Sequence, residues 1–378
     1  MHTVVISDFQ ALLNLKKAWL ALMEQSAWCS VFSSPEWNYS WWRVYGNGKQ
    51  LCVWTLWSSP ENLAGIYPLF MEKKQGVRWL CPLGYPRHAD TSGLVADSTR
   101  TMDVHAAFFS WLGSQGGWDV ARLSNVPVES LPDQQSSAMW QGTTEDMWSG
   151  FARKAGLKSK TVPAEPCMII PLRDSNFMDD RPGKVEFHTC KRKLKELNRH
   201  FRDAAVNHTP LDQACIDEVV KLSAEKSKAY REGKSFFNAP GAETFMRDMA
   251  GHEQQSFSLR LFTLHLNERL AAFELTYVWR NSLLVYARGF DHDFAKYSPG
   301  MYLLCNLINS SFDSKKICCV NMLLGGEAYK DAFSPITSEQ KTYTFINKTA
   351  FAYFYMLNTC IRNAIKKVFK SLIKKQNH

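Results

Sequence analysis

The chain has 378 residues, of which 45% are hydrophobic and 13% aromatic, enough for packed cores in roughly two or three domains. It contains no run of about 18 apolar residues that would cross a membrane and no charged-then-apolar leader at its N-terminus, so we expect a cytoplasmic globular protein. The 45 basic and 36 acidic residues give a net charge of +9, whose uneven distribution is more informative than its total.

The spacing of apolar residues predicts the elements of the first half. Asp8 is a candidate N-cap for the first helix. The loop at 82–93 is rich in turn residues and is a candidate pocket lining. In chain order we expect a strand at 3–6, a helix at 9–24, an aromatic helix from 35 to 42, strands at 51–57, 63–72 and 77–81, a helix at 101–114 and a strand at 118–123.

The second half is predicted in the same way. Its elements are a basic helix at 186–204, a helix at 211–229, a helix after Pro240, strands at 257–266, 270–279 and 282–288, a helix from Pro299 to about 312 and a strand at 317–324. The last segment, 361–378, has six lysines and arginines, no acid, and apolar residues at helical spacing. It predicts a basic amphipathic helix that either packs on the body with a solvated lysine face or lies on anionic lipid. Nucleic acid is a weaker third partner.

The two halves repeat one pattern. Phe32–Trp37 and Phe237–Pro240 each open a helix, and each helix is followed by a strand, at Leu51–Leu56 and Leu259–Leu264. Matching positions lie 205 to 208 residues apart. Because solenoid repeats are only about 20 to 50 residues long, this spacing indicates two duplicated domains. We place them at 1–165 and 166–350, with the basic helix at 351–378.

Cysteine and histidine give no sign of a metal site. The ten cysteines include no CxxC pair, and the ten histidines include no HExxH motif. Zinc sites need ligands at such close spacing. We therefore expect no metal and mostly buried, reduced thiols.

A strand followed directly by a helix in the second half is a candidate anion site. The strand ends at Tyr286, Ala287, Arg288 and Gly289, and the helix begins at Ser298, Pro299, Gly300 and Met301. Proline in the first turn, with Ser298 as N-cap, is a strong helix-start signal. The free N–H groups and the dipole at such an N-terminus would suit a pyrophosphate. From the local sequence alone, an ordinary capped helix is the simpler interpretation.

Two further groups of polar residues are candidates. Glu327, Tyr329 and Lys330 follow two glycines after the last strand and offer an acceptor, a donor and a cation; a surface turn with a salt-bridged lysine is the alternative. Lys191, Lys195 and Arg199 share one stripe of the basic helix. This stripe is either a solvated face or a positive lip over a phosphate or another anionic substrate.

The order of these motifs resembles a known family. The segment Phe294-Ala295-Lys296-Tyr297-Ser298-Pro299-Gly300, a helix, a strand and Gly-x-Glu-x-Tyr-Lys, together with the N-terminal Phe-x-Ser-Pro-x-Trp, are similar to the CelD/BcsL-like acetyltransferases of cellulose and exopolysaccharide operons, a branch of the GNAT superfamily. Relatives commonly carry Asp-Phe-Leu-Arg-Gly-Asp-Glu where this chain reads Asn321 to Glu327. An acid, an arginine and a second acid are therefore missing here.

The resemblance implies a mixed α/β fold of tandem GNAT-like domains, as in the FemABX-type peptidyltransferases. Each domain would have a mixed, mostly antiparallel sheet flanked by helices, and the second domain would hold the acyl donor. The implied donor residues are Tyr286 to Gly289, Ser298, Gly300 and Met301. Lys330 would clamp an anionic group, Glu327 would act as base and Tyr329 as acid.

We therefore predict an N-acyltransferase that moves an acetyl or longer acyl group from acyl-CoA to an amine of a sugar, amino acid or related metabolite, in bacterial polysaccharide or cell-envelope biosynthesis. The acceptor is expected between the halves, near Trp37, Tyr85, His88 and Asp90. The alternatives are a FemABX-like aminoacyl-tRNA-dependent transferase and a non-catalytic scaffold of a polysaccharide-synthesis complex. Nucleic acid is otherwise an improbable partner, the oligomeric state is open, and the basic helix would contact the inner face of the membrane.

Overall fold

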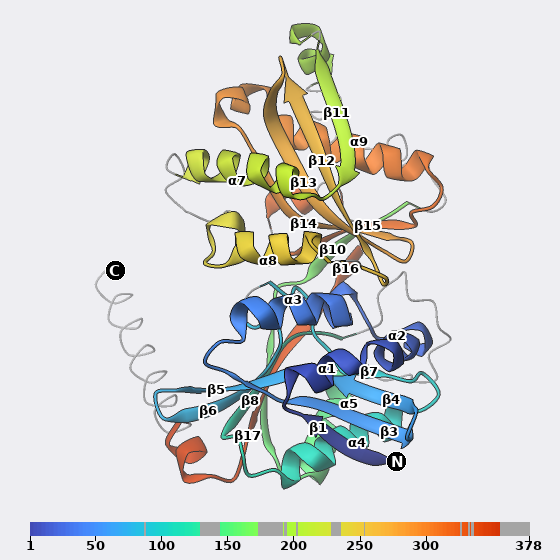
Figure 1. Ribbon diagram of the computed structural model, residues 1–378, viewed down its shortest axis with the longest axis vertical. Helices are drawn as coiled ribbons and strands as arrows, with labels where there is room; N and C mark the ends of the chain where they lie inside the picture. The colour runs from blue at the N-terminus through green and yellow to red at the C-terminus, as the bar shows by residue number, and fades with distance from the viewer. Residues whose placement is uncertain are drawn as a thin grey trace, which may run out of the picture.

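The protein consists of two mixed α/β halves stacked along the long axis of the molecule (Figure 1). The structure is a computed structural model. It describes residues 1–86, 88–128, 144–172, 192, 195–201, 203–227, 236–252, 254–325, 327–331, 333 and 336–355.

The first half contains two sheets with helices packed on them. The smaller sheet has the order β1-β3-β4-β7, and the larger has the order β2-β5-β6-β8-β17-β9. The strands are β1 (His2–Ile6), β2 (Gln50–Leu51), β3 (Val53–Ser59), β4 (Asn62–Tyr67), β5 (Leu69–Lys74), β6 (Val77–Pro82), β7 (Val95–Ala96), β8 (Val120–Pro127), β9 (Lys158–Pro163) and β17 (Gln340–Ile346). The helices are α1 (Phe9–Asn14), α2 (Lys16–Gln25), η1 (Val31–Ser33), α3 (Pro35–Tyr45), α4 (Thr101–Ser114) and α5 (Thr144–Lys154).

The second half is built on one sheet with the order β11-β12-β13-β14-β15-β10-β16. Its strands are β10 (Cys167–Pro171), β11 (Ala204–Pro210), β12 (Ser258–Leu266), β13 (Arg269–Trp279), β14 (Ser282–Phe290), β15 (Cys319–Leu324) and β16 (Ile336–Ser338). The helices are α7 (Gln213–Ser227), η2 (Phe236–Asn238), α8 (Ala242–Ala250), η3 (His292–Tyr297), α9 (Pro299–Asp313) and α10 (Ala328–Asp331). The expected fold class of mixed sheets flanked by helices is therefore confirmed.

One strand crosses between the halves. β10 opens the second half and pairs there with β15 and β16. β17, near the end of the chain, pairs with β8 and β9 of the first half. Residues 340–346, which the sequence analysis assigned to the second domain, thus complete the sheet of the first. Because the larger sheet of the first half needs β17, which follows the whole second half in sequence, the two halves form one structural unit.

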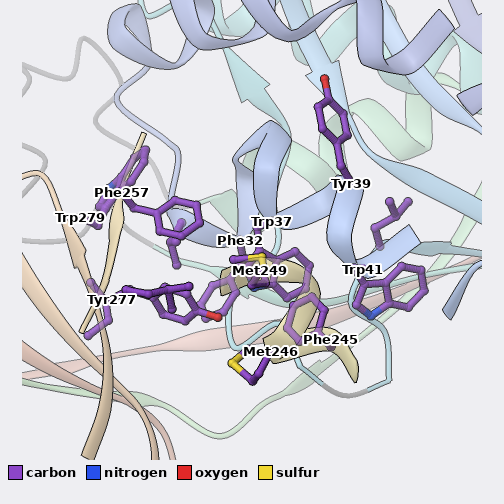
Figure 2. Close-up of a cluster of buried hydrophobic side chains, with 14 of the residues drawn as sticks. Phe32, Trp37, Tyr39, Trp41, Phe245, Met246, Met249, Phe257, Tyr277 and Trp279 are labelled. Carbon is purple, nitrogen blue, oxygen red and sulfur yellow. The ribbon is translucent and has the colours of Figure 1, made fainter. Parts of the chain in front are cut away.

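A shared core lies where the halves meet. α3 and α8, the two helices of the repeat, face each other there, and Figure 2 shows Trp37 and Phe245 among the side chains between them. The ring centroids of these two residues are 5.5 Å apart, and Arg43 pairs with Asp248 at 3.0 Å. A single cluster of buried side chains runs through both halves. Burial of this apolar surface stabilises the contact between the halves.

Local breaks modify several predicted elements. The helix expected at 9–24 is divided at Leu15 into α1 and α2, although Asp8 caps it as predicted, accepting a hydrogen bond from Ala11 N at 2.8 Å. The strand expected at 63–72 is interrupted at Pro68, which has no N–H for a ladder.

Cys305 is disulfide-bonded, so the expectation of reduced thiols is wrong at this position.

A helix begins at residue 350, one residue before the predicted start of the C-terminal helix. Residues 350–355 are helical, and the remainder of the predicted basic helix lies outside the described residues. Within the described ranges, no helix is long and apolar enough to span a membrane.

Candidate functional site

The strand edge predicted to hold the donor is unpaired in the structure. β14 and β15 run parallel and pair only through Ser282–Leu284 and Cys319–Asn321. Farther along, Tyr286 is an extra residue in β14, because Leu275 faces Ala287 and Thr276 faces Val285. Such a β-bulge bends a strand and interrupts its ladder. Within the part of the chain that the structure describes, the backbone of β14 after Val285 therefore makes no ladder hydrogen bonds to β15.

The helix that follows this strand, α9, begins beside the same edge. Pro299 occupies its first turn and no acid does, and Gly300 and Met301 carry its first N–H groups, which have no partner within the helix. Arg288 Nη2 donates to Gly300 O at 3.1 Å and so connects the strand to the helix start. The positive end of the helix is thus presented next to the unpaired edge of β14.

Ser298 lies at the predicted N-cap position, but its side chain does not cap the helix. It occupies the N-cap position in the left-handed conformation, with φ 54° and ψ 54°, and its hydroxyl makes no capping hydrogen bond. The turn of η3 directly before it forces the chain through this conformation, which residues other than glycine seldom adopt. Strain of this kind is a frequent property of binding sites.

The predicted basic stripe lies close to the first turn of α9. In the helical segment 195–200, Lys195 and Arg199 are exposed, and Leu197 is fully buried. Tyr302 of α9 donates to Asn198 Oδ1 at 3.3 Å. This segment thus packs against α9 through Leu197 and Asn198, and the positive lip stays a prediction. Lys191 lies outside the described residues.

A buried ion pair supports the strand edge from behind. Glu274 of β13 is fully buried and pairs with Arg288 of β14, with 2.7 Å between Oε1 and Nη2. The guanidinium also lies 4.6 Å from the ring centroid of Tyr329. Burial raises the pKa of Glu274 to about 7, against the opposing effect of Arg288. Arginine stays charged, so the cost of burying the pair falls on the carboxyl group.

Lys330 lies at the centre of a second group, at the end of β15. Its ammonium donates to Leu324 O at 2.7 Å and lies 3.0 Å from a carboxylate oxygen of Glu327. The Lys330 side chain is only 5% exposed, whereas that of Glu327 is 57% exposed. Lys330 already has two partners, so it positions its neighbours and is poorly available to clamp an anionic substrate.

Asp90 reaches this group from the first half of the chain. Its Oδ2 accepts a hydrogen bond from Leu324 N at 3.2 Å. Because Lys330 donates to the carbonyl of the same residue, Asp90 and Lys330 both hydrogen-bond to the backbone of Leu324. Burial raises the pKa of Asp90 to about 6, and the charge of Lys330 partly opposes this effect. The predicted acceptor residue Asp90 and the predicted catalytic residues Glu327 and Lys330 are therefore brought together.

The other predicted acceptor residues have different surroundings. Trp37 is fully buried in the shared core (Figure 2) and offers no surface to a ligand, which corrects that prediction. His88 stacks on Tyr45 with centroids 4.6 Å apart, and its carbonyl accepts a hydrogen bond from Tyr286 OH at 2.8 Å. The Tyr286 side chain thus points into the interface, leaving only its backbone for the donor edge. Tyr85 is partly buried, with Arg122 over its ring at 5.9 Å.

The sequence analysis missed Glu274. The available signal was one carboxylate within the otherwise apolar strand predicted at 270–279, followed by Arg288 in the adjacent strand. Their pairing becomes visible only with the register, in which Glu274 faces Arg288 directly.

Comparisons with known proteins agree with this architecture. Residues 187–331 match the family model of an acetyltransferase (GNAT) domain. FemX is similar over 91% of this chain and 97% of its own, with a TM-score of 0.59 and 9% identity. L-PGS from Bacillus licheniformis is similar over 91% and 95%, with a TM-score of 0.54 and 11% identity. A tandem GNAT protein from the clavulanic acid biosynthesis pathway, solved without AcCoA, is similar over 91% and 97%, with a TM-score of 0.50 and 14% identity.

No curated protein sequence matches the chain significantly. The chain nevertheless has the fold of the FemABX-like tandem GNAT proteins, and residues 187–331 of its second half match the acetyltransferase (GNAT) domain model. At these identities the structural similarity establishes the fold and not the substrate. The narrower CelD/BcsL-like resemblance stays a prediction.

Proposed function

We propose that the protein is an N-acyltransferase that takes an acetyl or longer acyl group from acyl-CoA and transfers it to an amine of a sugar, amino acid or related metabolite, in bacterial polysaccharide or cell-envelope biosynthesis. The observation that carries the proposal is the unpaired edge of β14 leading to the N-terminus of α9. An extended amide chain can pair with a strand edge, and a pyrophosphate suits a helix N-terminus.

The donor would extend from α9 to the bulge in β14. Its pyrophosphate would accept hydrogen bonds from the N–H groups of Gly300 and Met301. Backbone N–H groups around Ala287 would polarise the thioester carbonyl and stabilise the oxyanion. By contrast, the first turn of α4, the corresponding helix of the first half, contains Asp103, which disfavours an anion. The second half is therefore the better donor site.

The acceptor amine would attack the thioester directly. The new C–N bond forms, the C–S bond breaks, and the amine loses one proton to a carboxylate while the departing thiolate gains one. Asp90 is our candidate for the base, because a carboxyl group with a pKa near 6 is matched to work near neutral pH. Lys330 would hold both carboxylates in place. Tyr329 is our candidate for protonating the thiolate.

Aminoacyl-tRNA is the alternative donor, as in FemABX chemistry. The net charge of +9 and the similarity to FemX support it. Charged surfaces bind RNA with a steep salt dependence, so this alternative predicts tRNA binding that weakens strongly with salt and no saturable binding of acyl-CoA. A non-catalytic scaffold would bind neither donor.

Calorimetric titration with acetyl-CoA and a longer acyl-CoA tests the donor site, using Gly300→Glu as the variant. A Cβ at Gly300 would lie 3.6 Å from its nearest neighbour, so the backbone tolerates a side chain. Gly116→Glu is the matched control, because that glycine is exposed with nothing within 4 Å. We expect saturable binding that Gly300→Glu abolishes and Gly116→Glu leaves intact. Absence of binding by the unmodified protein would reject the proposal.

The base is tested by release of CoA from acetyl-CoA in the presence of amino sugars and amino acids. With Asp90 as base, kcat/KM rises with pH through about 6, because the carboxyl group must be ionised to accept a proton. Asp90→Asn should lower the rate by roughly 100-fold or more and remove this rise, whereas Glu327→Gln should keep it. The opposite result would assign the base to Glu327.

A further inference from the structure

Exposed aromatic residues gather at the start of the C-terminal helix. Phe351, Tyr353 and Phe354, here called the aromatic patch, are 56%, 48% and 61% exposed. Among the residues that the structure describes, the other large hydrophobic side chains that are exposed are all aliphatic. Clustered exposed apolar side chains mark interaction surfaces more often than single ones do.

The opposite face of this helix is held firmly by the body. Ala352 is fully buried, and Tyr355, one turn further on, packs edge-on against Trp79 with centroids 5.1 Å apart. Thr349 fixes the helix start, since its hydroxyl donates to Asp119 Oδ1 at 2.6 Å and accepts from Ala352 N at 3.1 Å. Because residues three apart share a helix face, Phe351 and Phe354 lie together on the exposed side of the helix, and the Phe351 ring also borders the β5–β6 turn.

Lysines surround the aromatic patch. Lys158 Nζ lies 5.1 Å from the ring centroid of Tyr353, and Lys160 is exposed on the same strand, β9, at the edge of its sheet. A Cβ on Gly76 would lie 3.8 Å from Phe351, which brings the β5–β6 turn with exposed Lys73 and Lys74 next to the patch. Glu72 is the acid of this turn, and it is paired with Lys74.

We propose that the aromatic patch and its lysines dock on an anionic phospholipid bilayer. Aromatic side chains favour the membrane interface, and basic residues beside them gain from anionic headgroups. In the sequence, the 23 residues after Tyr355 contain six lysines and arginines and no acid, so the chain continues with the same charge. The proposal is independent of the acyl-transfer reaction.

The charge distribution argues against two other occupants. A second copy of the chain, paired through the same surface as in two-fold dimers, would bring the two sets of lysines face to face. The basic tail of the same chain would also be repelled by Lys158 and Lys160. An anionic surface satisfies both the aromatic and the cationic side chains.

Co-sedimentation of the full chain with phosphatidylcholine vesicles, with and without phosphatidylglycerol, tests the proposal. We expect binding only to the anionic vesicles, and a loss of roughly tenfold or more in affinity for Phe351→Ser/Phe354→Ser, because apolar area leaves the interface. Val5→Ser/Met102→Ser, which removes two exposed apolar side chains elsewhere, should bind normally.

A second pair of variants tests the charge. Lys158→Glu/Lys160→Glu should weaken binding by more than about tenfold, since each basic residue near the surface contributes roughly fivefold. Lys315→Glu/Lys316→Glu makes the same change in net charge beyond the end of α9 and should have a much smaller effect. Equal effects of the two pairs, or unchanged binding of the double serine variant at an unchanged thermal midpoint, would overturn the proposal. So would loss of self-association or of RNA binding in the serine variant while vesicle binding persists.

Discussion

Replacing Glu274 by glutamine should remove a pH dependence from the stability of the protein. The Glu274 carboxyl group is fully buried, and its pKa rises from 4.5 to about 7 on folding because burial opposes its ionisation. The folded state then holds a proton that the unfolded state has released, so stability falls as pH rises from about 4.5 through 7. Each pKa unit corresponds to about 1.4 kcal/mol, which gives a loss of roughly 3 kcal/mol.

Glutamine resembles the protonated carboxyl group and does not titrate. At pH 5 the variant and the unmodified protein should have similar free energies of unfolding, whereas at pH 8 the variant should be more stable by roughly 3 kcal/mol. Urea denaturation at both pH values measures this difference. Asp90, whose pKa is also raised, affects both proteins alike and cancels in the comparison.

Glu243→Gln is the control, because Glu243 pairs with Arg247 on the surface at 2.8 Å, with side chains 45% and 31% exposed. Its effect should be below about 1 kcal/mol in both measurements. If Glu274→Gln is instead the less stable protein at pH 8, the Glu274–Arg288 pair is a net source of stability and our reasoning about its desolvation is refuted.

Two other substitutions test the framework of the site. In Gly289→Ala, the new Cβ would lie 2.5 Å from Phe273 Cε1, so overpacking should lower stability by about 1–3 kcal/mol and displace the edge of β14. Calorimetry should then show weakened binding of acyl-CoA. Unchanged binding would show that this edge does not hold the donor. Asp119→Ala removes a fully buried carboxylate that accepts from Arg78 N, Nε and Nη2 at 2.8–3.1 Å and from Thr349. Denaturation should show a loss of about 3 kcal/mol, and a change below about 1 kcal/mol would contradict this role.

Elements whose local signals agree with their packing were predictable from the sequence. The helix expected at 101–114 has these bounds in the structure, and the strands expected at 257–266, 270–279 and 282–288 differ from β12, β13 and β14 by at most two residues at any end. In each case the apolar pattern that indicates the element stops at turn residues, so the pattern predicts both the type of element and its ends.

Features that depend on the meeting of distant segments were not predictable. Nothing near Asp90 in the sequence indicates that Leu324 N, more than 200 residues later, is its hydrogen-bond partner. The raised pKa of Glu274 likewise needs the register of β13 and β14. Trp37 illustrates the opposite error. An aromatic residue in a repeated motif suggested a ligand contact, but in the structure it fills the core at the junction of the repeats.

The return of β17 to the first half explains why the site draws on both halves of a duplicated chain. Gln340 at the start of β17 lies against Cys167 at the start of β10, with 2.8 Å between the side-chain amide and Sγ. With its amide oriented to satisfy both ends, Gln340 donates to Asn125 O at 2.8 Å and Asp90 O at 3.3 Å. The crossing of the two strands therefore fixes the segment that delivers Asp90 to Leu324 and Lys330. A second half produced alone would lack Asp90 and the sheet that receives β17, so both the proposed base and its support depend on the duplication.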